Sequence, residues 1–541
     1  MKTSHYLLCR SLQKRSPMTT RDGQLDGFGS WQRQLRPGRH TIMVRWAQRC
    51  FRLIVFVVFI PFAAWGDLSI VQTDESDGRS TTFKMTVTPA AEPVPALKYR
   101  LMLREIDLKQ GNAAPYYYRA LLDMPTVQNA MNESFGEDYH EWYRQNDLAL
   151  GELPLERVRE AVSLLQGSPM ENLRTAAGRR RCDWGWNTEN IHGTELISFL
   201  LDEVQRSRWL CRVLMLQARL AMATGDIDKA IDLLRINYRL ARDIAKEPIL
   251  VCDLVGIAIA SLGNWSVIEL ISQPGAPNLY WALAELPRPL IGIRQSIRAE
   301  MSLGLRMFPF LLDAETAEHS PEEWARLLTE GLMDIESLEI SRVDHGLPTA
   351  DVRVAQLGVM AMSVAVYPGA KQRLVDSGMD PQRIEQMPVG QVVAIDSLRE
   401  YRRISDEEEK WQYVPYGTMG QSGEPDLFWK IAQSGPLTRG YGYVAATLIL
   451  PAVQAARSAE QRILWQMDAI RTVEAIRMHA AASGQLPRTL DEVRVVPVPL
   501  NPATDQPFAY DRNGDTAVLD LPFSDGIPGQ AYRFEITLSG P

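Results

Sequence analysis

Apolar residues recur with a helical period along most of the chain after about residue 111. The run 153–167 places its apolar residues on one face, as in an amphipathic helix closed by a terminal glycine. Two longer runs, 195–223 and 226–245, predict an antiparallel helical hairpin with its turn at Gly225-Asp226. The pattern therefore indicates a mainly α fold.

Within this hairpin, small residues, a turn glycine and one aromatic follow the spacing of a tetratricopeptide-type (TPR) repeat. They are Ala218, Gly225, Ala230, Tyr238 and Ala241. Small side chains at a helix crossing let two helices approach closely. A weaker echo begins at Leu262-Gly263-Asn264-Trp265. One full hairpin and one echo predict an irregular helical bundle or a TPR-like α-solenoid over residues 111–440.

Pro- and Gly-containing breaks, such as Pro368-Gly369, separate the other predicted helices of this body. Those helices are expected at 289–312, 321–332, 351–366, 389–411 and 424–433. A longer helix is predicted at about 443–482, with a kink at Pro451 and an end at Gly484.

Strand-like alternation occurs near both ends of the predicted mature chain. Thr81–Thr88 alternates apolar and polar residues, so 67–110 is interpreted as a small β or extended region. Asn513-Gly514 predicts a tight turn of type I′ between strands near 507–511 and 515–520. A third strand is expected at 531–538. Residues 441–541 are therefore predicted to form a separate module, a long helix with a small antiparallel sheet.

The N-terminal region resembles an export signal. Residues 53–65 (LIVFVVFIPFAAW) carry no charge, follow three arginines and lead to small residues before Asp67. This is the order of a secretory signal, and thirteen residues are fewer than the roughly 20 that span a bilayer as a helix. We interpret 43–66 as a cleaved signal peptide or, alternatively, an uncleaved membrane anchor. The protein is expected in the periplasm or cell envelope.

The preceding residues, 1–42, are polar, Arg-rich and without regular periodicity. They are interpreted as a disordered leader, or as sequence that is not translated if synthesis starts at Met43. The choice between Met1 and Met43 stays open.

Composition limits the classes of function. Hydrophobic residues make up 45% of the 541 residues and charged residues 23%, as in globular proteins. The net charge is −8, and the basic excess is confined to residues 1–52, so the remainder is more acidic than the whole chain. Nucleic acid is therefore not an expected partner, because phosphate binding needs a basic face. Membrane contact is expected only through the N-terminal apolar segment.

Three cysteines, Cys182, Cys211 and Cys252, follow the predicted signal. An odd number leaves at least one thiol unpaired, and a Cys211–Cys252 bridge stays an open alternative. The chain has no C-x-x-C pair. No metal or cofactor is predicted.

Residues 179–186 (RRRCDWGW) are the most suggestive candidate site. Arginines beside tryptophans can bind an anionic or sugar ligand by charge and stacking. In the alternative interpretation, the tryptophans anchor a loop and the arginines pair with the acidic body. The candidate ligand or partner surface consists of Arg179, Arg180, Arg181, Trp184 and Trp186.

Two parts of the sequence resemble known groups of proteins. Phrases such as ALKYRLMLREIDLKQGNAAPYYYRALL (96–122) and QPGAPNLYWALAELPRPLI (273–291) resemble a family of uncharacterised secreted planctomycete proteins. That resemblance covers about 96–310 and implies export and a helical fold, with no activity. The C-terminal part is similar to helix-plus-hairpin segments of secretion pseudopilins: residues 448–462 resemble the helix of pilin-like planctomycete proteins, and residues 479–510 resemble the segment after the helix in type II secretion pseudopilins. A pilin, however, carries its apolar helix at the mature N-terminus, and here the helix is internal.

Catalytic signatures are incomplete. His140-Glu141 lacks the second histidine of a zinc-protease helix, because position 144 is Arg. The first hypothesis is therefore an exported, non-catalytic helical interaction or scaffold protein with a protein partner in the cell envelope. The second is an exported enzyme of unrecognised type, such as a hydrolase acting on envelope or polysaccharide material. An enzyme should gather two carboxylates, or a carboxylate and a histidine, in one deep pocket.

Overall fold

The structure is a computed structural model that describes residues 69–75, 78–136, 138–143, 148–165, 167–186, 194–306, 308–340, 352–415, 418, 440–522 and 529–539. All of them belong to one of two compact units, Trp46–Pro541. The predicted leader, the signal segment and the predicted helix at 424–433 lie outside the described residues. The mainly α fold with small β regions is confirmed.

Short helices and a two-stranded sheet form the first part of the body. The helices are α2 (Ala114–Leu122), α3 (Met124–Phe135), α4 (Tyr139–Trp142), α5 (Leu155–Ser163) and α6 (Ser168–Ala177). Prolines start α2, α3 and α6, where the missing N–H has no helical partner to lose. Strand β3 (Lys109–Asn112) pairs in parallel with β4 (Arg179–Arg181). Short 3-10 turns lie at Glu105–Asp107 and Leu150–Glu152.

The predicted hairpin is present as α7 (Thr194–Ala223) and α8 (Ile227–Ile244). Gly225 turns the chain with φ 77°, and Asp226 caps α8 by accepting a hydrogen bond from Lys229 N at 3.2 Å. Ala218, Ala230 and Ala241 are fully buried. The small residues therefore lie in the packed interior, as their spacing predicted.

The weaker repeat echo at Leu262-Gly263-Asn264-Trp265 does not open a new helix, because those residues lie inside one continuous helix, α9 (Leu250–Ile271). A Cβ on Gly263 would lie 2.7 Å from Asn237 Nδ2, and one on Gly256 would lie 2.6 Å from Ala241 O. These glycines let α9 cross α8 at close range. The small-residue signal thus marks helix packing and not a turn.

Helix α9 has the length and apolar composition of a membrane span, and no other helix among the described residues does. Yet 78% of its apolar window is buried inside the fold. It also carries fully buried Asp253, Asn264 and Glu269, and Glu269 accepts a hydrogen bond from Arg219 Nε at 3.0 Å. In this fold α9 is therefore a core helix.

The second half of the body is built from helices of very different length. They are α10 (Tyr280–Ala284), α11 (Arg294–Arg306), α12 (Pro309–Leu312), α13 (Pro321–Ile340), α14 (Val352–Asp376), α15 (Pro381–Gln386) and α16 (Val389–Lys410), followed by a 3-10 turn at Trp411–Tyr413. The predicted break at Pro368 is wrong, because α14 continues through it. Pro368 is exposed, and Arg373 beyond it forms a two-pronged ion pair with buried Asp396 that holds the last turns of α14.

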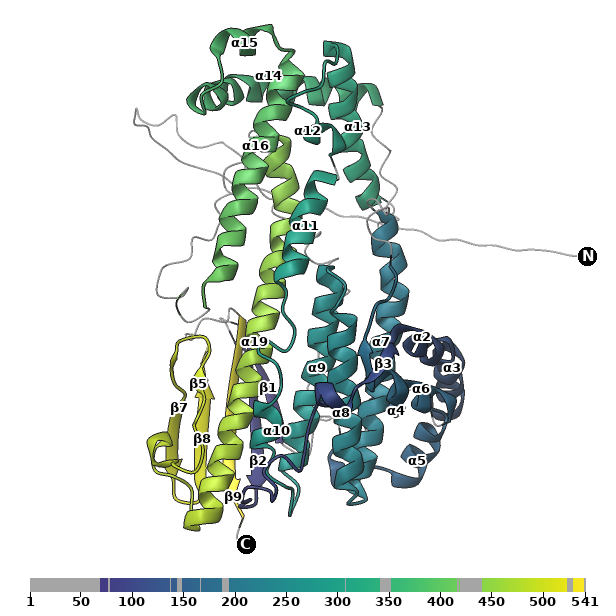
Figure 1. Ribbon diagram of the computed structural model, residues 1–541, viewed down its shortest axis with the longest axis vertical. Helices are drawn as coiled ribbons and strands as arrows, with labels where there is room; N and C mark the ends of the chain where they lie inside the picture. The colour runs from purple at the N-terminus through teal and green to yellow at the C-terminus, as the bar shows by residue number, and fades with distance from the viewer. Residues whose placement is uncertain are drawn as a thin grey trace, which may run out of the picture. The chain divides into compact units, whose positions relative to one another are not determined.

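The long C-terminal helix, α19 (Tyr441–Ser483), keeps Pro451 inside it and ends at Gly484, whose φ is 75°. It passes α16 and α11 and continues along α9 (Figure 1). Its aromatic residue Trp465 meets Tyr532 of the sheet edge to face, with ring centroids 6.1 Å apart. One helix thus links the helical body to the β region.

The two predicted β regions form one five-stranded sheet, which corrects their assignment to separate modules, 67–110 and 441–541. The strands are β1 (Ser69–Glu75), β2 (Gly78–Val87), β7 (Ala509–Asn513), β8 (Thr516–Leu521) and β9 (Gly529–Leu538). Their order is β1-β2-β9-β8-β7, and only the central β2–β9 pair is parallel. Phe83 of β2 lies opposite Phe534 of β9. Its ring packs on Trp265 of α9, with the ring centroids 4.9 Å apart.

The C-terminal turn differs by one residue from its prediction. Asn513 pairs with Thr516, so Gly514 and Asp515 occupy the two central positions. Among the described non-glycine residues only Asp505 has a positive φ, whereas Gly514 has φ 65°. Positive φ at the first central residue alone follows the II′ pattern and not the predicted I′. A separate two-stranded sheet joins β5 (Leu500–Asn501) and β6 (Gln506–Pro507).

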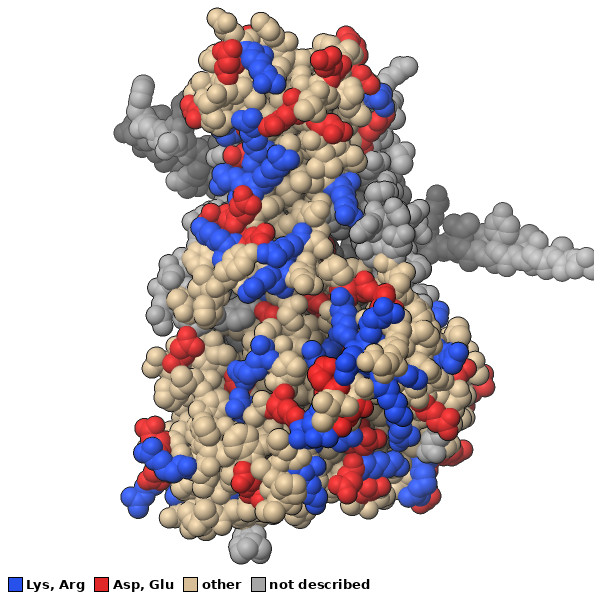
Figure 2. All heavy atoms as spheres, in the orientation of Figure 1, with Lys and Arg blue, Asp and Glu red and all other residues tan. Residues whose placement is uncertain are grey.

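Charged side chains of both signs lie interspersed on the face shown in Figure 2. Several are paired between different segments, such as Arg298 with Glu409 at 2.6 Å and Arg399 with Glu315 at 2.9 Å. Such exposed pairs contribute little to stability individually. Their effect is to neutralise surface charge locally.

Candidate functional site

The three arginines of the predicted 179–186 site lie on β4, and two of them donate to neighbouring segments. Arg179 donates to Gln110 O at 2.7 Å and to the Tyr116 hydroxyl at 2.8 Å. Arg180 donates to Glu105 O at 2.9 Å. The side chain of Arg181 is exposed and has no partner among the residues the structure describes. Two of the three guanidinium groups are thus used to hold the loop.

The two tryptophans of the site are stacked on each other, with centroids 5.2 Å apart. Trp184 is buried, also stacks with Tyr117 at 5.5 Å, and donates its indole N–H to Asp243 O at 2.7 Å. Trp186 is half-buried and donates its indole N–H to the Tyr118 hydroxyl at 2.6 Å. The rings therefore pack against the tyrosines that follow Pro115.

Beneath these rings, Asp243 of α8 gathers three polar partners. Its carboxylate is fully buried and accepts hydrogen bonds from the Tyr117 hydroxyl at 3.0 Å and from Arg239 Nε at 2.8 Å. Lys246 Nζ lies 3.1 Å from its other oxygen. Burial, followed by the charge of Asp243, raises the pKa of Tyr117 well above its usual value. Because Arg239 also donates to Arg179 O at 2.8 Å, this arrangement ties α2, β4 and α8 together.

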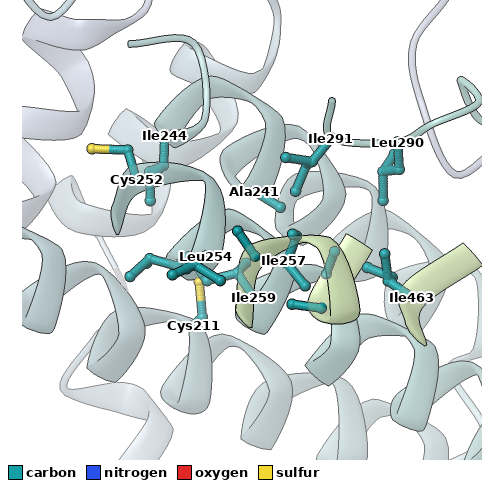
Figure 3. Close-up of a cluster of buried hydrophobic side chains, with 14 of the residues drawn as sticks. Cys211, Ala241, Ile244, Cys252, Leu254, Ile257, Ile259, Leu290, Ile291 and Ile463 are labelled. Atoms are coloured by element: carbon teal, nitrogen blue, oxygen red, sulfur yellow. The ribbon is translucent and has the colours of Figure 1, made fainter. Parts of the chain in front are cut away.

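Cys182, Cys211 and Cys252 are all buried and free, so the Cys211–Cys252 bridge is wrong. Figure 3 shows Cys211 and Cys252 among apolar side chains such as Ile244 and Leu254. Burial raises the pKa of each thiol, and the charge of Asp243 adds to the effect at Cys182. Such thiols are poor nucleophiles.

A second arginine cluster lines a hollow of about 380 Å³ that the sequence did not indicate. Asp468 and Arg471 come from α19, and Arg288 comes from the segment between α10 and α11. The other lining residues come from the end of the α16 region and from the loop around β5. They are Pro415, Pro499, Leu500, Pro502 and Asp505.

Asp468 is almost fully buried and holds both arginines of this hollow. Arg288 donates from both terminal nitrogens to its two oxygens, and Arg471 Nη1 donates to Oδ1 at 3.1 Å. The hydrogen bonds from both guanidinium groups occupy the carboxylate oxygens that a general base would need. The carboxylate therefore positions the arginines.

Tyr280 connects this cluster to the opposite wall of the hollow. The Arg471 guanidinium lies 5.2 Å from the centre of the Tyr280 ring and donates to its hydroxyl at 3.4 Å. The same hydroxyl donates a short hydrogen bond to Pro497 O. Pro497 precedes the wall residues at 499–502. The Tyr280 side chain therefore holds both Arg471 and this wall in place.

An apolar face of α14 is the other unusual surface. Residues 354–370 contain no charged residue. Leu357, Met360 and Val364 are exposed by 67%, 55% and 68%, whereas Val359 and Val366 on the other side of the helix are buried. Spacings of three and four residues place the exposed side chains on one stripe. The sequence predicted this helix but not which of its faces is exposed.

Sequence reasoning missed the hollow because its charged residues are far apart in the chain. Arg288 and Asp468 are separated by 180 residues, and no local pattern joins them. The cluster of prolines at 497–502 was the only local sign, since closely spaced prolines favour an extended, rigid segment. That sign alone does not identify a site.

Comparison of the chain with protein-family models, curated proteins and solved structures finds no match. The resemblances to secreted planctomycete proteins and to pseudopilin segments stay predictions. The assignment of function therefore depends on the geometry of the described residues.

Proposed function

We propose that the protein is an exported, non-catalytic helical interaction or scaffold protein that binds a protein partner in the cell envelope through the apolar face of α14. The observation that supports this most is the stripe of Leu357, Met360 and Val364, each more than half exposed. A contiguous apolar patch exposed to water is unfavourable, and such patches commonly mark interaction sites.

The stripe is held on a rigid helix, which suits recognition of another helix or a groove. Val359, Val366 and Ala370 anchor the opposite side of α14 in the core. Arg373 pairs with Asp396 of α16, and Lys371 pairs with Glu385 of α15. A surface that is already ordered loses little conformational entropy when it binds. Helix faces of this kind are typical of helix-in-groove recognition.

Photo-crosslinking in the cells that make the protein tests this function. With p-benzoylphenylalanine at position 360, we expect a covalent adduct with another protein of the envelope. The same group at exposed Gln372 of α14, which lies beyond the uncharged segment, should give no such adduct. Adding Leu357→Glu to the position-360 variant should abolish the adduct. Adducts only with lipid, with a second copy of the chain, or equally from both positions would contradict the proposal.

Export is the other part of the proposal, supported by the three arginines, the apolar segment 53–65 and the small residues before Asp67. N-terminal sequencing of the native protein is the direct measurement. A mature chain that starts near Asp67 is expected. A chain that starts at Met1 and fractionates with the cytoplasm would refute export.

A further inference from the structure

We propose that the hollow between Arg288, Arg471 and the β5 loop binds a carboxylate carried on an apolar group. A small organic acid and the C-terminal residue of a peptide both have this chemistry. The inference is independent of the α14 surface, because the lining residues of the hollow include none from α14.

Spare hydrogen-bond donors are the first support. A guanidinium group has five N–H donors in a planar fork that matches a carboxylate. Arg288 gives two of its donors to Asp468, and Arg471 gives one to Asp468 and one to Tyr280. The remaining donors have no partner among the described residues. One of them, Arg471 Nε, is also buried.

The four charged lining residues sum to zero, but the wall that holds both arginines has a local positive excess that favours a negative group on the ligand. Two guanidinium groups face a single carboxylate, Asp468, so one positive charge at this wall is not balanced locally. Asp505, the other charged lining residue, is exposed and has no ion-pair partner among the described residues. Its negative charge repels an anion in the hollow, so removing this charge is expected to increase the affinity for an anionic ligand.

The opposite wall supplies the apolar part of the recognition. Pro415, Pro499 and Pro502 have fixed backbone φ angles, so this wall is largely preformed. Leu500 is exposed by 52% and is available to cover an apolar ligand group. A volume of about 380 Å³ lies within the range of small-molecule sites, roughly 300–1,000 Å³.

Isothermal titration calorimetry of the full chain tests the site with N-acetyl-L-leucine as the probe and N-acetyl-L-leucinamide as its uncharged match. We expect saturable binding of the acid, and at least about tenfold weaker binding of the amide and of acetate. A short peptide that ends in leucine distinguishes the sources. Tighter binding of the peptide identifies a chain terminus as the ligand, and equal binding identifies a small acid. Both results support the shared chemistry.

Four variants assign the binding to the hollow. Arg471→Gln should weaken acid binding at least about tenfold, whereas Arg488→Gln, an exposed arginine outside the hollow, should leave it unchanged. Leu500→Ser should weaken it about two- to fivefold through the loss of apolar contact.

Asp505→Asn tests the proposal even if the other variants fold poorly, because this variant is expected to bind the acid more tightly. Asn tolerates the positive φ of 55° at this position. Removing the opposing charge should tighten acid binding about two- to fivefold. Equal binding of acid and amide, binding of acetate as tight as that of the probe, no loss in Arg471→Gln or no gain in Asp505→Asn would each overturn the inference.

Discussion

Two groups of arginines lie beside aromatic rings in this molecule, and they differ in where their N–H donors point. In the cluster at 179–186, Arg179 and Arg180 donate to backbone carbonyls and a tyrosine of neighbouring segments, whereas Arg179 Nε and the exposed Arg181 side chain lack a described partner. In the hollow, Arg288 and Arg471 converge on one carboxylate and keep several donors without a described partner.

A dense local motif is therefore not by itself a binding site. The arginines and tryptophans of 179–186 are adjacent in the sequence, yet residues of 105–118 and of α8 already accept most of their hydrogen bonds. Residues that converge from distant segments create a concave surface with donors that nearby backbone has not used. The second arrangement is the better candidate for a ligand.

The largest effect that can test this contrast is expected at Asp243. Asp243→Ala leaves buried Arg239 without its carboxylate partner and removes the acceptor of Tyr117, so the free energy of unfolding should fall by about 3–5 kcal/mol. Urea unfolding followed by circular dichroism measures it. Asp228→Ala, an exposed position of the same helix, should change it by less than about 0.5 kcal/mol. A loss below about 1 kcal/mol at Asp243 would show that the 179–186 cluster is not a structural centre.

An intermediate effect is expected at Asp468, the matching carboxylate of the hollow. Asp468→Asn should cost about 1–3 kcal/mol, less than Asp243→Ala, because the Arg288 side chain is 42% exposed and water can solvate it. The same urea titration applies. If Asp468→Asn were as costly as Asp243→Ala, the hollow would be as much a packing centre as the other cluster, and the contrast would fail.

The smallest effects compare one apolar side chain from each cluster. Trp186→Ala removes a half-buried ring that stacks on Trp184, and should lower the free energy of unfolding by about 1–2 kcal/mol. Leu500→Ala, at the hollow, should change it by less than about 0.5 kcal/mol. Thermal unfolding of the two variants side by side is the check. A larger cost at Leu500 than at Trp186 would reverse the assignment of structural and binding roles.

Local elements of the fold were predictable because their signals are local. The alternation of Phe83, Met85 and Val87 predicted β2, and all three are buried. Gly225-Asp226 predicted the turn between α7 and α8. The signal at Gly263 was also real but ambiguous, since a glycine serves a turn and a close helix crossing equally well.

Long-range features could not be predicted from the same evidence. The parallel pairing of β2 with β9 joins segments about 450 residues apart, and neither strand carries a mark of its partner. Likewise, nothing near Arg288 in the sequence indicates Asp468. The residues that were predicted as a site came from one short stretch, because adjacency is the only proximity that a single sequence displays.

The central claim, that the hollow and not the 179–186 cluster recognises a carboxylate, is tested most directly by NMR of the arginine Nε–Hε groups. Resonances are assigned with single Arg→Lys variants and followed during titration with N-acetyl-L-leucine. We predict saturable shifts of Arg288 and Arg471 and unchanged resonances of Arg179 and Arg180. Shifts confined to Arg179, Arg180 or Arg181, with Arg288 and Arg471 unmoved, would contradict the account.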